Sequence, residues 1–355
     1  MSDRIDRLRR VMQRKGVDAL LVTGPVNVRW LSGFTGTSGL CVVDGDAVRF
    51  VTDFRYREQA AEQLGSGWSI DVAVDLLEAA VEPLEGPLRL GFDENHLTFK
   101  AHSELRSELP DNEIALVEAG GLVEGLREVK EEGEVAAIRA AAQLADAALQ
   151  EVLSRGLTGR TEREVATDIE FTMRRMGAHG PSFPPIVAHG PHGALPHAEP
   201  RDVEIAAGTL CVVDWGAELD GYASDCTRTF ATGELSDEDA GIYELVLGAQ
   251  LHALDQVEPG IEAKVVDAAA RDIIAAGGHG NEFGHGLGHG VGAEVHEAPR
   301  LSQRSDAILR PGHVVTIEPG IYVPGRVGVR IEDLVVVTSD GHEVLSGLPK
   351  ELTTA

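Results

Sequence analysis

Hydrophobic residues follow two different patterns along the chain, and the change between them divides it into two parts. Over residues 1–125 a charged amphipathic helix is followed by short β-type runs at 19–23, 28–31, 40–43 and 47–52 and by helical patterns at 56–64 and 76–84. Gly, Pro, Asn and Asp separate these runs, as they do in turns. The pattern predicts a compact α/β domain.

The second part, residues 126–355, begins with a long amphipathic helix. Its apolar positions recur at helical spacing up to Gly156: Ile138, Ala142, Ala145, Leu149 and Val152. Further helices are expected over 161–176, 243–258 and 261–276. Strands come in adjacent pairs, 210–215 with 222–230 and 314–318 with 327–337, and the first pair flanks the turn residues Asp220 and Gly221. Two similar hairpins predict an α+β domain with a duplicated half.

Composition narrows the class of protein. The 355 residues are 43% hydrophobic, which is ordinary for a folded chain, and no apolar run approaches the about 18 residues of a membrane span. A net charge of -27 disfavours nucleic acid and anionic membranes as partners. Cys41, Cys211 and Cys226 are isolated and are interpreted as small buried residues. We therefore expect a cytoplasmic protein, and the acidity alone does not identify its habitat.

Acidic residues at the ends of apolar strands are the first candidates for chemistry. Asp214 ends the run LCVVD, and Asp225 follows eleven positions later in SDCTRTF, so a hairpin turning between them would place the two carboxylates roughly opposite each other. Glu318 and Glu332 repeat the pattern in VVTIE and VRIEDL. Taken singly, each has a simpler interpretation: a turn former at Asp214, an Asp225–Arg228 salt bridge, or a surface pair of Arg330 with Glu332.

The stretch GHGLGHGVGAEVHE, residues 284–297, adds three histidines in a ladder of glycines. No register gives a dinucleotide-binding GxGxxG, and His296 is not followed by the second histidine of a zincin motif. Four carboxylates with one imidazole would suit two ions of Mn²⁺, Co²⁺, Fe²⁺ or Zn²⁺. A water between two such ions ionises near neutral pH and can attack a carbonyl. This set of residues predicts metal-assisted hydrolysis.

Four motifs in this order, DWGAELDGYASDCTRTF, GHGLGHGVGAEVHE, TIEPGIY and VRIEDL, resemble those of the aminopeptidase P and prolidase family, the dinuclear metallopeptidases with the pita-bread fold. The segments NVRWLSGFTGTSG and VTDFRY look like the N-terminal domain of bacterial proline peptidases in that group. The resemblance implies a creatinase-like α/β N-terminal domain. It also implies an α+β pita-bread catalytic domain with a curved antiparallel sheet and pseudo-two-fold symmetry.

The same resemblance implies roles for individual residues. The ligands of two divalent metal ions, Mn²⁺ first and Co²⁺, Zn²⁺ or Fe²⁺ as alternatives, would be Asp214, Asp225, His289, Glu318 and Glu332. Glu318 would also move protons, His296 would stabilise the tetrahedral intermediate, and His197 would contact the substrate. His285, Arg330 and Tyr322 would line the pocket. A surface-loop position for His197 and core packing for Tyr322 are the alternatives.

The expected activity is hydrolysis of the bond between an N-terminal residue and proline. The sequence favours an Xaa-Pro aminopeptidase that accepts longer peptides over the alternative, a prolidase restricted to Xaa-Pro dipeptides. A metal-free creatinase-like hydrolase and a non-catalytic peptide-binding homologue are more remote. The family resemblance also implies a homodimer. His189 and His192 depart from the family's loop sequence, so they leave the shape of the substrate pocket open.

Overall fold

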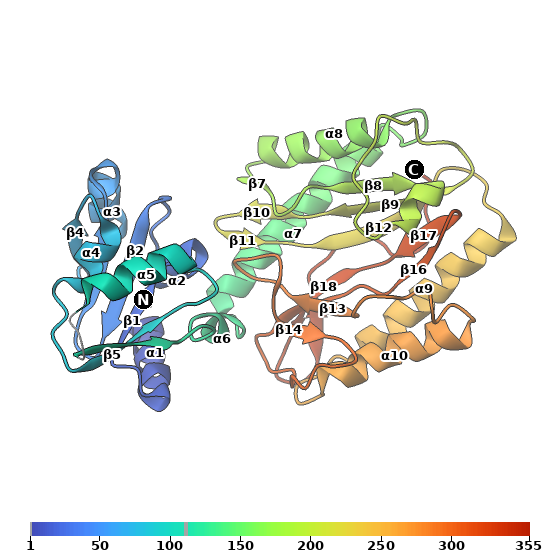
Figure 1. The fold of residues 1–355 in the computed structure, drawn as a ribbon. Helices are drawn as coiled ribbons and strands as arrows, with labels where there is room; N and C mark the ends of the chain where they lie inside the picture. Colours follow the sequence, from blue (N-terminus) through green and yellow to red (C-terminus); the bar gives the residue numbers. More distant parts are fainter. Residues whose placement is uncertain (1, 110–112) are drawn as a thin grey trace. The chain divides into compact units, whose positions relative to one another are not determined.

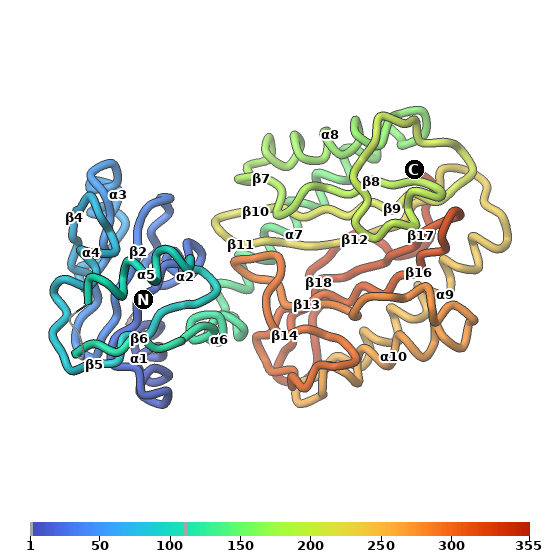
Figure 2. Tube along the Cα trace, viewed as in Figure 1, coloured from blue at the N-terminus to red at the C-terminus, as the bar shows by residue number. Residues whose placement is uncertain are grey.

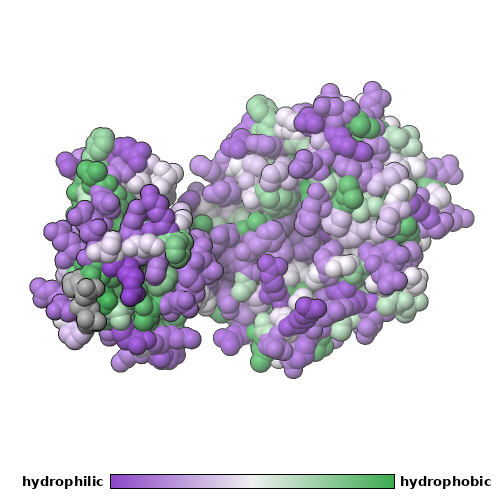
Figure 3. Space-filling model, viewed as in Figure 1, coloured by the Kyte–Doolittle hydropathy of each residue, from purple (hydrophilic) through white to green (hydrophobic). Residues whose placement is uncertain are grey.

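The computed structural model describes residues 2–109 and 113–355, which form two compact units, Met1–Arg127 and Glu128–Ala355. Hydrophilic residues predominate on the face of each unit shown in Figure 3. Within the described residues, no helix is both long enough and apolar enough to cross a membrane. Each unit buries hydrophobic clusters of its own and is described separately.

The first unit is built on a six-stranded mixed sheet in the order β4-β3-β2-β1-β5-β6. Alternate residues of the central strand β1 belong to two different cores, Leu20 and Val22 to one and Ala19 and Leu21 to the other, because neighbouring side chains on a strand point to opposite faces. Helices α1 and α2 cover the first face, and α4 and α5 cover the second (Figure 1). The elements in chain order are α1 (Ser2–Lys15), β1 (Ala19–Val22), α2 (Pro25–Ser32), β2 (Gly39–Asp44), β3 (Val48–Thr52), η1 (Phe54–Tyr56), α3 (Arg57–Gln63), β4 (Ser69–Val72), α4 (Leu76–Val81), β5 (Leu88–Phe92), α5 (Phe99–Glu108), β6 (Ile114–Glu118) and α6 (Glu124–Arg127).

One predicted strand of this unit is wrong: residues 28–31 lie in helix α2. An apolar run of four residues has no periodicity that separates strand from helix. The deciding signals are local, because Pro25 starts the helix and Gly33 ends it in the left-handed conformation at φ 81°. Val28 and Leu31, three residues apart, then both point into the core.

The second unit repeats one arrangement twice, two helices followed by antiparallel strands. The first half consists of α7 (Glu132–Leu153), α8 (Glu162–Arg175), β7 (Gly180–Pro181), β8 (Ile186–His189), η2 (Gly190–Ala194), β9 (Leu210–Trp215), β10 (Ala217–Leu219), β11 (Tyr222–Ala223) and β12 (Cys226–Ala231). The second half consists of α9 (Asp237–Asp255), α10 (Ala263–Ala276), β13 (Gly288–Gly290), β14 (Glu297–Leu301), β15 (Val314–Ile317), β16 (Gly320–Val323), β17 (Val327–Arg330), β18 (Asp333–Val337) and β19 (His342–Val344). The duplicated half expected from the sequence is confirmed.

The two halves meet where β9 and β12 of the first lie beside β17 and β18 of the second, as the trace in Figure 2 shows. The backbone N–H of Glu332 donates to the carbonyl of Thr227 at 3.0 Å. The hydroxyl of Thr229 accepts from the N–H of Arg330 at 3.1 Å and lies 2.9 Å from that residue's carbonyl. These bonds join segments about a hundred positions apart in the sequence.

The hairpins are more elaborate than the sequence pattern predicts. Asp220 and Gly221 form a two-residue turn between β10 and β11, with φ of 52° and 84°, as an Asp-Gly pair favours. Strand β15 does pair with β18, but the expected strand 327–337 is broken into β17 and β18, and β16 pairs with β17 in a hairpin of its own. Helix α9 begins at Asp237 instead of 243, because the Ser236 hydroxyl caps it.

Candidate metal centre

A cavity of about 850 Å³ in the second unit opens where the two halves meet. The residues around it come from strands β8, β9, β13, β14 and β17 and from the loops before and after strands of the sheets. The candidate residues that line it are His197, Asp214, Asp225, His285, His289, His296, Glu318, Arg330 and Glu332. Tyr322 does not line the cavity. The structure therefore gathers nearly all the predicted site residues in one place.

Three carboxylates face one another at the bottom of this cavity. Asp214, Asp225 and Glu332 each offer an oxygen, and these oxygens lie within 4.8 Å of one another. Asp214 Oδ1 and Glu332 Oε1 are buried and have no hydrogen-bond partner among the described residues. Burial, and then the neighbouring carboxylates, raises the pKa of Asp225 and of Glu332 well above its usual range. Such a group of buried, repelling carboxylates fits divalent cations, which would neutralise it.

His289 and Glu318 complete the group. His289 Nε2 lies 3.3 Å from Glu318 Oε1 and 3.6 Å from Asp225 Oδ2. The other ring nitrogen, Nδ1, is 3.1 Å from the carbonyl of Gly290, so Nδ1 carries the proton and the Nε2 lone pair faces the carboxylates. Burial also lowers the pKa of His289, which favours the neutral ring that a metal requires.

Two threonines that the sequence analysis missed orient these candidate ligands. The Thr227 hydroxyl donates to Glu332 Oε2 at 2.7 Å, and the Thr316 hydroxyl donates to Glu318 Oε1 at 3.0 Å. Thr316 also accepts from the backbone N–H of His289 at 3.0 Å. Each threonine stands two positions from an acidic candidate, and period-2 alternation along the strand is the signal that could have found it.

The glycines of the ladder serve strand packing. A Cβ on Gly288 would lie 2.0 Å from the carbonyl oxygen of Thr316, and one on Gly290 would lie 2.2 Å from that of Ala298. Strand β13 is therefore held between β14 and β15 at a distance that only glycine allows. Gly284, by contrast, faces open space. The glycines of β13 therefore allow a close approach between backbones.

Arg330 is buried, and it pairs with Asp214. The sequence spacing had suggested a pair with Glu332. Its guanidinium donates to Asp214 Oδ2 at 2.5 Å, to the Thr227 hydroxyl at 2.9 Å and to the Tyr322 hydroxyl at 2.8 Å. The simpler interpretation of a surface pair with Glu332 is therefore wrong. The Asp225–Arg228 salt bridge is wrong as well, because Arg228 pairs with Asp333 at 2.7 Å.

Two of the remaining predicted residues line the cavity, and a third is buried behind it. His197 and His296 are exposed and line the cavity, and the His296 ring lies 4.4 Å from that of His289, centroid to centroid. The Tyr322 hydroxyl is buried between Arg330 and His285, 3.1 Å from His285 Nε2. Its contacts are those of the packing alternative, and a contact with substrate stays a prediction.

His189 and His192 are the two histidines for which the sequence did not predict the shape of the substrate pocket. Both face Glu162. The fully buried Glu162 carboxylate lies 2.8 Å from His189 Nδ1 and 2.9 Å from His192 Nδ1, and it accepts from Arg201 Nε at 3.0 Å. Burial alone would raise the pKa of Glu162, but hydrogen bonds from Arg201 and from the His189 N–H lower it to about 2. Glu162 therefore contacts both ends of the segment that carries His197 and holds them together. No local sequence pattern around Glu162 predicts these contacts.

The sequence analysis also missed an apolar wall of the cavity. It is formed by Phe183, Pro184, Pro185, Ile186, Pro196, Val295 and Leu301. Arg300 and Glu199 add charges at the same cavity. The lining of the cavity therefore combines acidic and histidine side chains with apolar ones.

Both parts of the chain match families of known proteins. Residues 136–339 match metallopeptidase family M24, and residues 4–129 match the creatinase/prolidase N-terminal domain. The chain is 37% identical to an Xaa-Pro dipeptidase of Pyrococcus horikoshii, with 99% of both chains covered. Its structure resembles that of an Xaa-Pro dipeptidase from Bacillus anthracis, with a TM-score of 0.95, 40% identity and coverage of 100% and 99%. It also resembles that of an X-Pro aminopeptidase from Thermotoga maritima, with a TM-score of 0.89, 33% identity and coverage of 98% and 100%.

Proposed function

This chain belongs to metallopeptidase family M24 and carries a creatinase/prolidase N-terminal domain, and we propose that it hydrolyses Xaa-Pro dipeptides. The sequence analysis favoured longer Xaa-Pro peptides, but the comparisons support the dipeptidase alternative better. The quoted dipeptidases are 37% and 40% identical to this chain, against 33% for the aminopeptidase.

The observation that carries the proposal is the convergence of five ligand-type side chains in one cavity, two of them with a buried carboxylate oxygen that has no hydrogen-bond partner in the described chain. We propose that Asp214, Asp225, His289, Glu318 and Glu332 hold two divalent cations, with Mn²⁺ the first choice and Co²⁺, Zn²⁺ or Fe²⁺ the alternatives. Two such ions balance four carboxylates. When bound, they would polarise the scissile carbonyl and lower the pKa of a water molecule.

The protein's own groups have separate tasks in this proposal. Glu318 takes a proton from the attacking water and delivers it to the proline nitrogen as the C–N bond breaks. His296, exposed beside His289, donates to the carbonyl oxygen as negative charge develops there. His197 contacts the substrate from the segment held by Glu162, and Arg330 fixes Asp214. The apolar wall suits the proline ring, and a cavity of about 850 Å³ accommodates a dipeptide.

Metal binding is tested by elemental analysis after loading with Mn²⁺ and removal of excess metal. We expect Asp225→Asn to bind at least one equivalent less than the wild-type protein, with a fall in kcat/KM of about a hundredfold or more. Asp146→Asn is the matched control, since it makes the same exchange at a buried aspartate of the same unit away from the cavity. Full metal content and activity in Asp225→Asn would refute the ligand assignment.

Substrate length is tested separately, by comparing kcat/KM for Ala-Pro and Ala-Pro-Ala with the same metal-loaded protein. A dipeptidase should prefer Ala-Pro by at least about tenfold. Equal or faster cleavage of the tripeptide would restore the aminopeptidase interpretation. Absence of cleavage of both peptides, with metal bound, would favour a binding homologue, and turnover of creatine without metal would favour the creatinase-like alternative.

The homodimer implied by the family is tested by analytical ultracentrifugation.

A further inference from the structure

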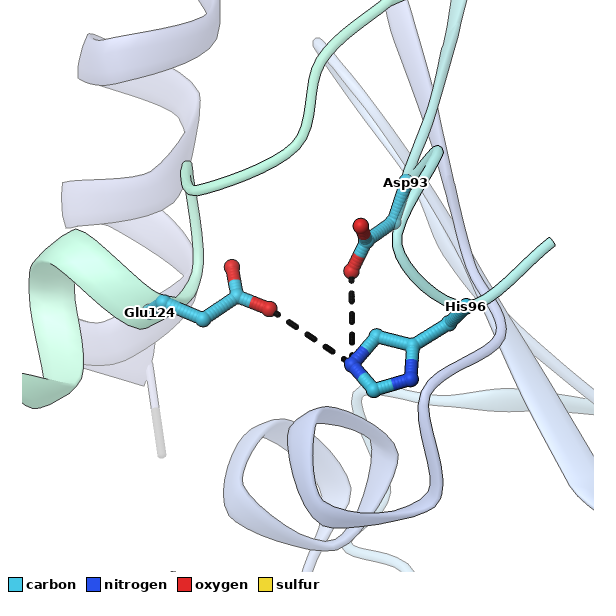
Figure 4. A group of neighbouring side chains, drawn as sticks. All are labelled: Asp93, His96 and Glu124. Carbon is cyan, nitrogen blue, oxygen red and sulfur yellow. Dashed lines mark ion pairs between the residues drawn. The ribbon is translucent and has the colours of Figure 1, made fainter. Parts of the chain in front are cut away.

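A second group of ligand-type side chains lies in the first unit, in a part of the chain that the proposed activity does not use. Asp93 follows strand β5, His96 lies in the turn after it, and Glu124 is the first residue of α6. Figure 4 shows both carboxylates pointing at the same nitrogen of the His96 ring. One ligand atom from each residue lies within 4.8 Å of the other two.

The distances from the His96 ring to the two carboxylates are too long for direct hydrogen bonds. His96 Nε2 lies 3.7 Å from Asp93 Oδ2 and 3.8 Å from Glu124 Oε1. Two ligand atoms at about 2.0–2.2 Å from one ion lie roughly 3.4 Å apart at a tetrahedral angle. Shifts of a few tenths of an ångström would therefore bring His96 Nε2 and each carboxylate oxygen to the separation that two ligands of one cation have.

Asp93 supplies the independent sign of a ligand. The residue is 6% exposed, and its Oδ1 accepts from the N–H of Asn95 at 3.0 Å. Its Oδ2, the oxygen aimed at His96, is buried without a hydrogen-bond partner among the described residues. Burial, and then the neighbouring Glu124 carboxylate, raises the pKa of Asp93, because the ionised form is desolvated and repelled there. A cation at this position would relieve that cost.

The other two groups are held in place by their neighbours. Glu124 Oε1 accepts from Asn27 Nδ2 at 2.6 Å, and Asn27 Oδ1 in turn accepts from Arg127 Nη1 at 2.6 Å. The His96 ring packs on Gly24, where a Cβ would lie only 2.6 Å from ring carbon Cδ2. Supporting hydrogen bonds and packing of this kind orient the ligands of a metal site. The side chains of His96 and Glu124 are about a third exposed, so an ion can enter from solvent.

We propose that Asp93, His96 and Glu124 bind one divalent transition-metal cation, with water completing its coordination. One imidazole and two carboxylates suit Zn²⁺, which takes mixed nitrogen and oxygen ligands in tetrahedral geometry. The ion ties the turn after β5 to the start of α6, so its binding stabilises the first unit. The alternative is that the three side chains hold no cation, and a count of bound Zn²⁺ distinguishes the two cases.

The experiment counts Zn²⁺ equivalents on the full chain after removal of metal by a chelator, using equilibrium dialysis and elemental analysis. We expect His96→Ala to bind one equivalent fewer than the wild-type protein. His102→Ala is the matched control because His102 is the other histidine of this unit and packs on Phe92 outside the group. Ions in the cavity of the second unit are common to all variants and cancel in the comparison.

Asp93→Asn decides whether the ion occupies this group or only an exposed histidine. We expect it also to lose one equivalent, since Asp93 is buried. Zn²⁺ should raise the unfolding temperature of the first unit in the wild-type protein but not in His96→Ala, while Ala-Pro hydrolysis by the metal-loaded protein stays unchanged. Wild-type stoichiometry in His96→Ala, or loss in His96→Ala that Asp93→Asn does not share, would overturn the proposal. If circular dichroism shows that either variant is unfolded, Glu124→Gln replaces it, since its amide oxygen still accepts from Asn27.

Discussion

The glycine ladder gives the sharpest test of how strand packing supports the cavity. In Gly288→Ala the new Cβ would lie 2.0 Å from the Thr316 carbonyl oxygen and 2.7 Å from its hydroxyl. An ordinary contact needs more than about 3.4 Å, so β13 and β15 would have to separate by over about 1 Å. Neither atom belongs to the flexible end of a long side chain. The free energy of unfolding should therefore fall by about 3 kcal/mol, which is the upper end of the range for substitutions that overpack a core.

The displaced groups belong to the ligand set, so the effect should extend beyond stability. Thr316 accepts from the His289 N–H and donates to Glu318, and both contacts would be disturbed. For a domain of this size, about 3 kcal/mol corresponds to a melting temperature lower by roughly 6–12 °C. Calorimetry at fixed Mn²⁺ concentration, with Mn²⁺ content measured on the same samples, would check both expectations.

Gly284→Ala is the matched control from the same ladder. Its Cβ would meet nothing within 4 Å, and the backbone there is not in the left-handed region. The melting temperature should stay within about 2 °C of the wild-type value. If the two variants melted at the same temperature, the explanation of the ladder by backbone contact would be refuted.

Three further predictions concern groups outside the ligand set. Burial raises the pKa of Asp146 from 3.8 to about 6, so this residue's contribution to stability is lost as pH rises through that range. In urea titrations, Asp146→Asn should have the same free energy of unfolding as the wild-type protein near pH 4. Near pH 7.5 the variant should be more stable by up to about 3 kcal/mol. A constant difference at both pH values would contradict this. Lys130→Met should lower the free energy of unfolding by about 3–5 kcal/mol, because the buried Glu297 carboxylate loses the ammonium group 2.9 Å away. In the same assay, the double variant Lys130→Met with Glu297→Gln should recover most of that loss. Glu162→Ala should free the segment 189–201 and raise KM for Ala-Pro more than it lowers kcat, whereas unchanged kinetics would show that the segment needs no anchor.

Local signals in the sequence were enough to predict much of the fold. The Asp220-Gly221 pair gave a two-residue turn because those residue types accept positive φ, and the spacing of apolar residues in 126–156 gave the long helix α7. Where local signals were weak, prediction failed. Residues 28–31 were too short to show a period, and the break between Arg330 and Asp333 has no turn residue to mark it.

The sequence by itself determined which side chains are available for chemistry at the candidate metal centre, because acidic residues ending apolar strands and histidines among glycines are visible in the residue order. Only the tertiary structure decided how those side chains pair. Arg330 binds Asp214 instead of Glu332, and His189 meets Glu162 instead of the cavity. Such pairings depend on the register between strands and loops far apart in the chain, as in the Thr227–Glu332 bond that spans 105 positions. Burial, which leaves carboxylate oxygens without partners, is a property of the packed fold and has no signature in any single stretch of sequence.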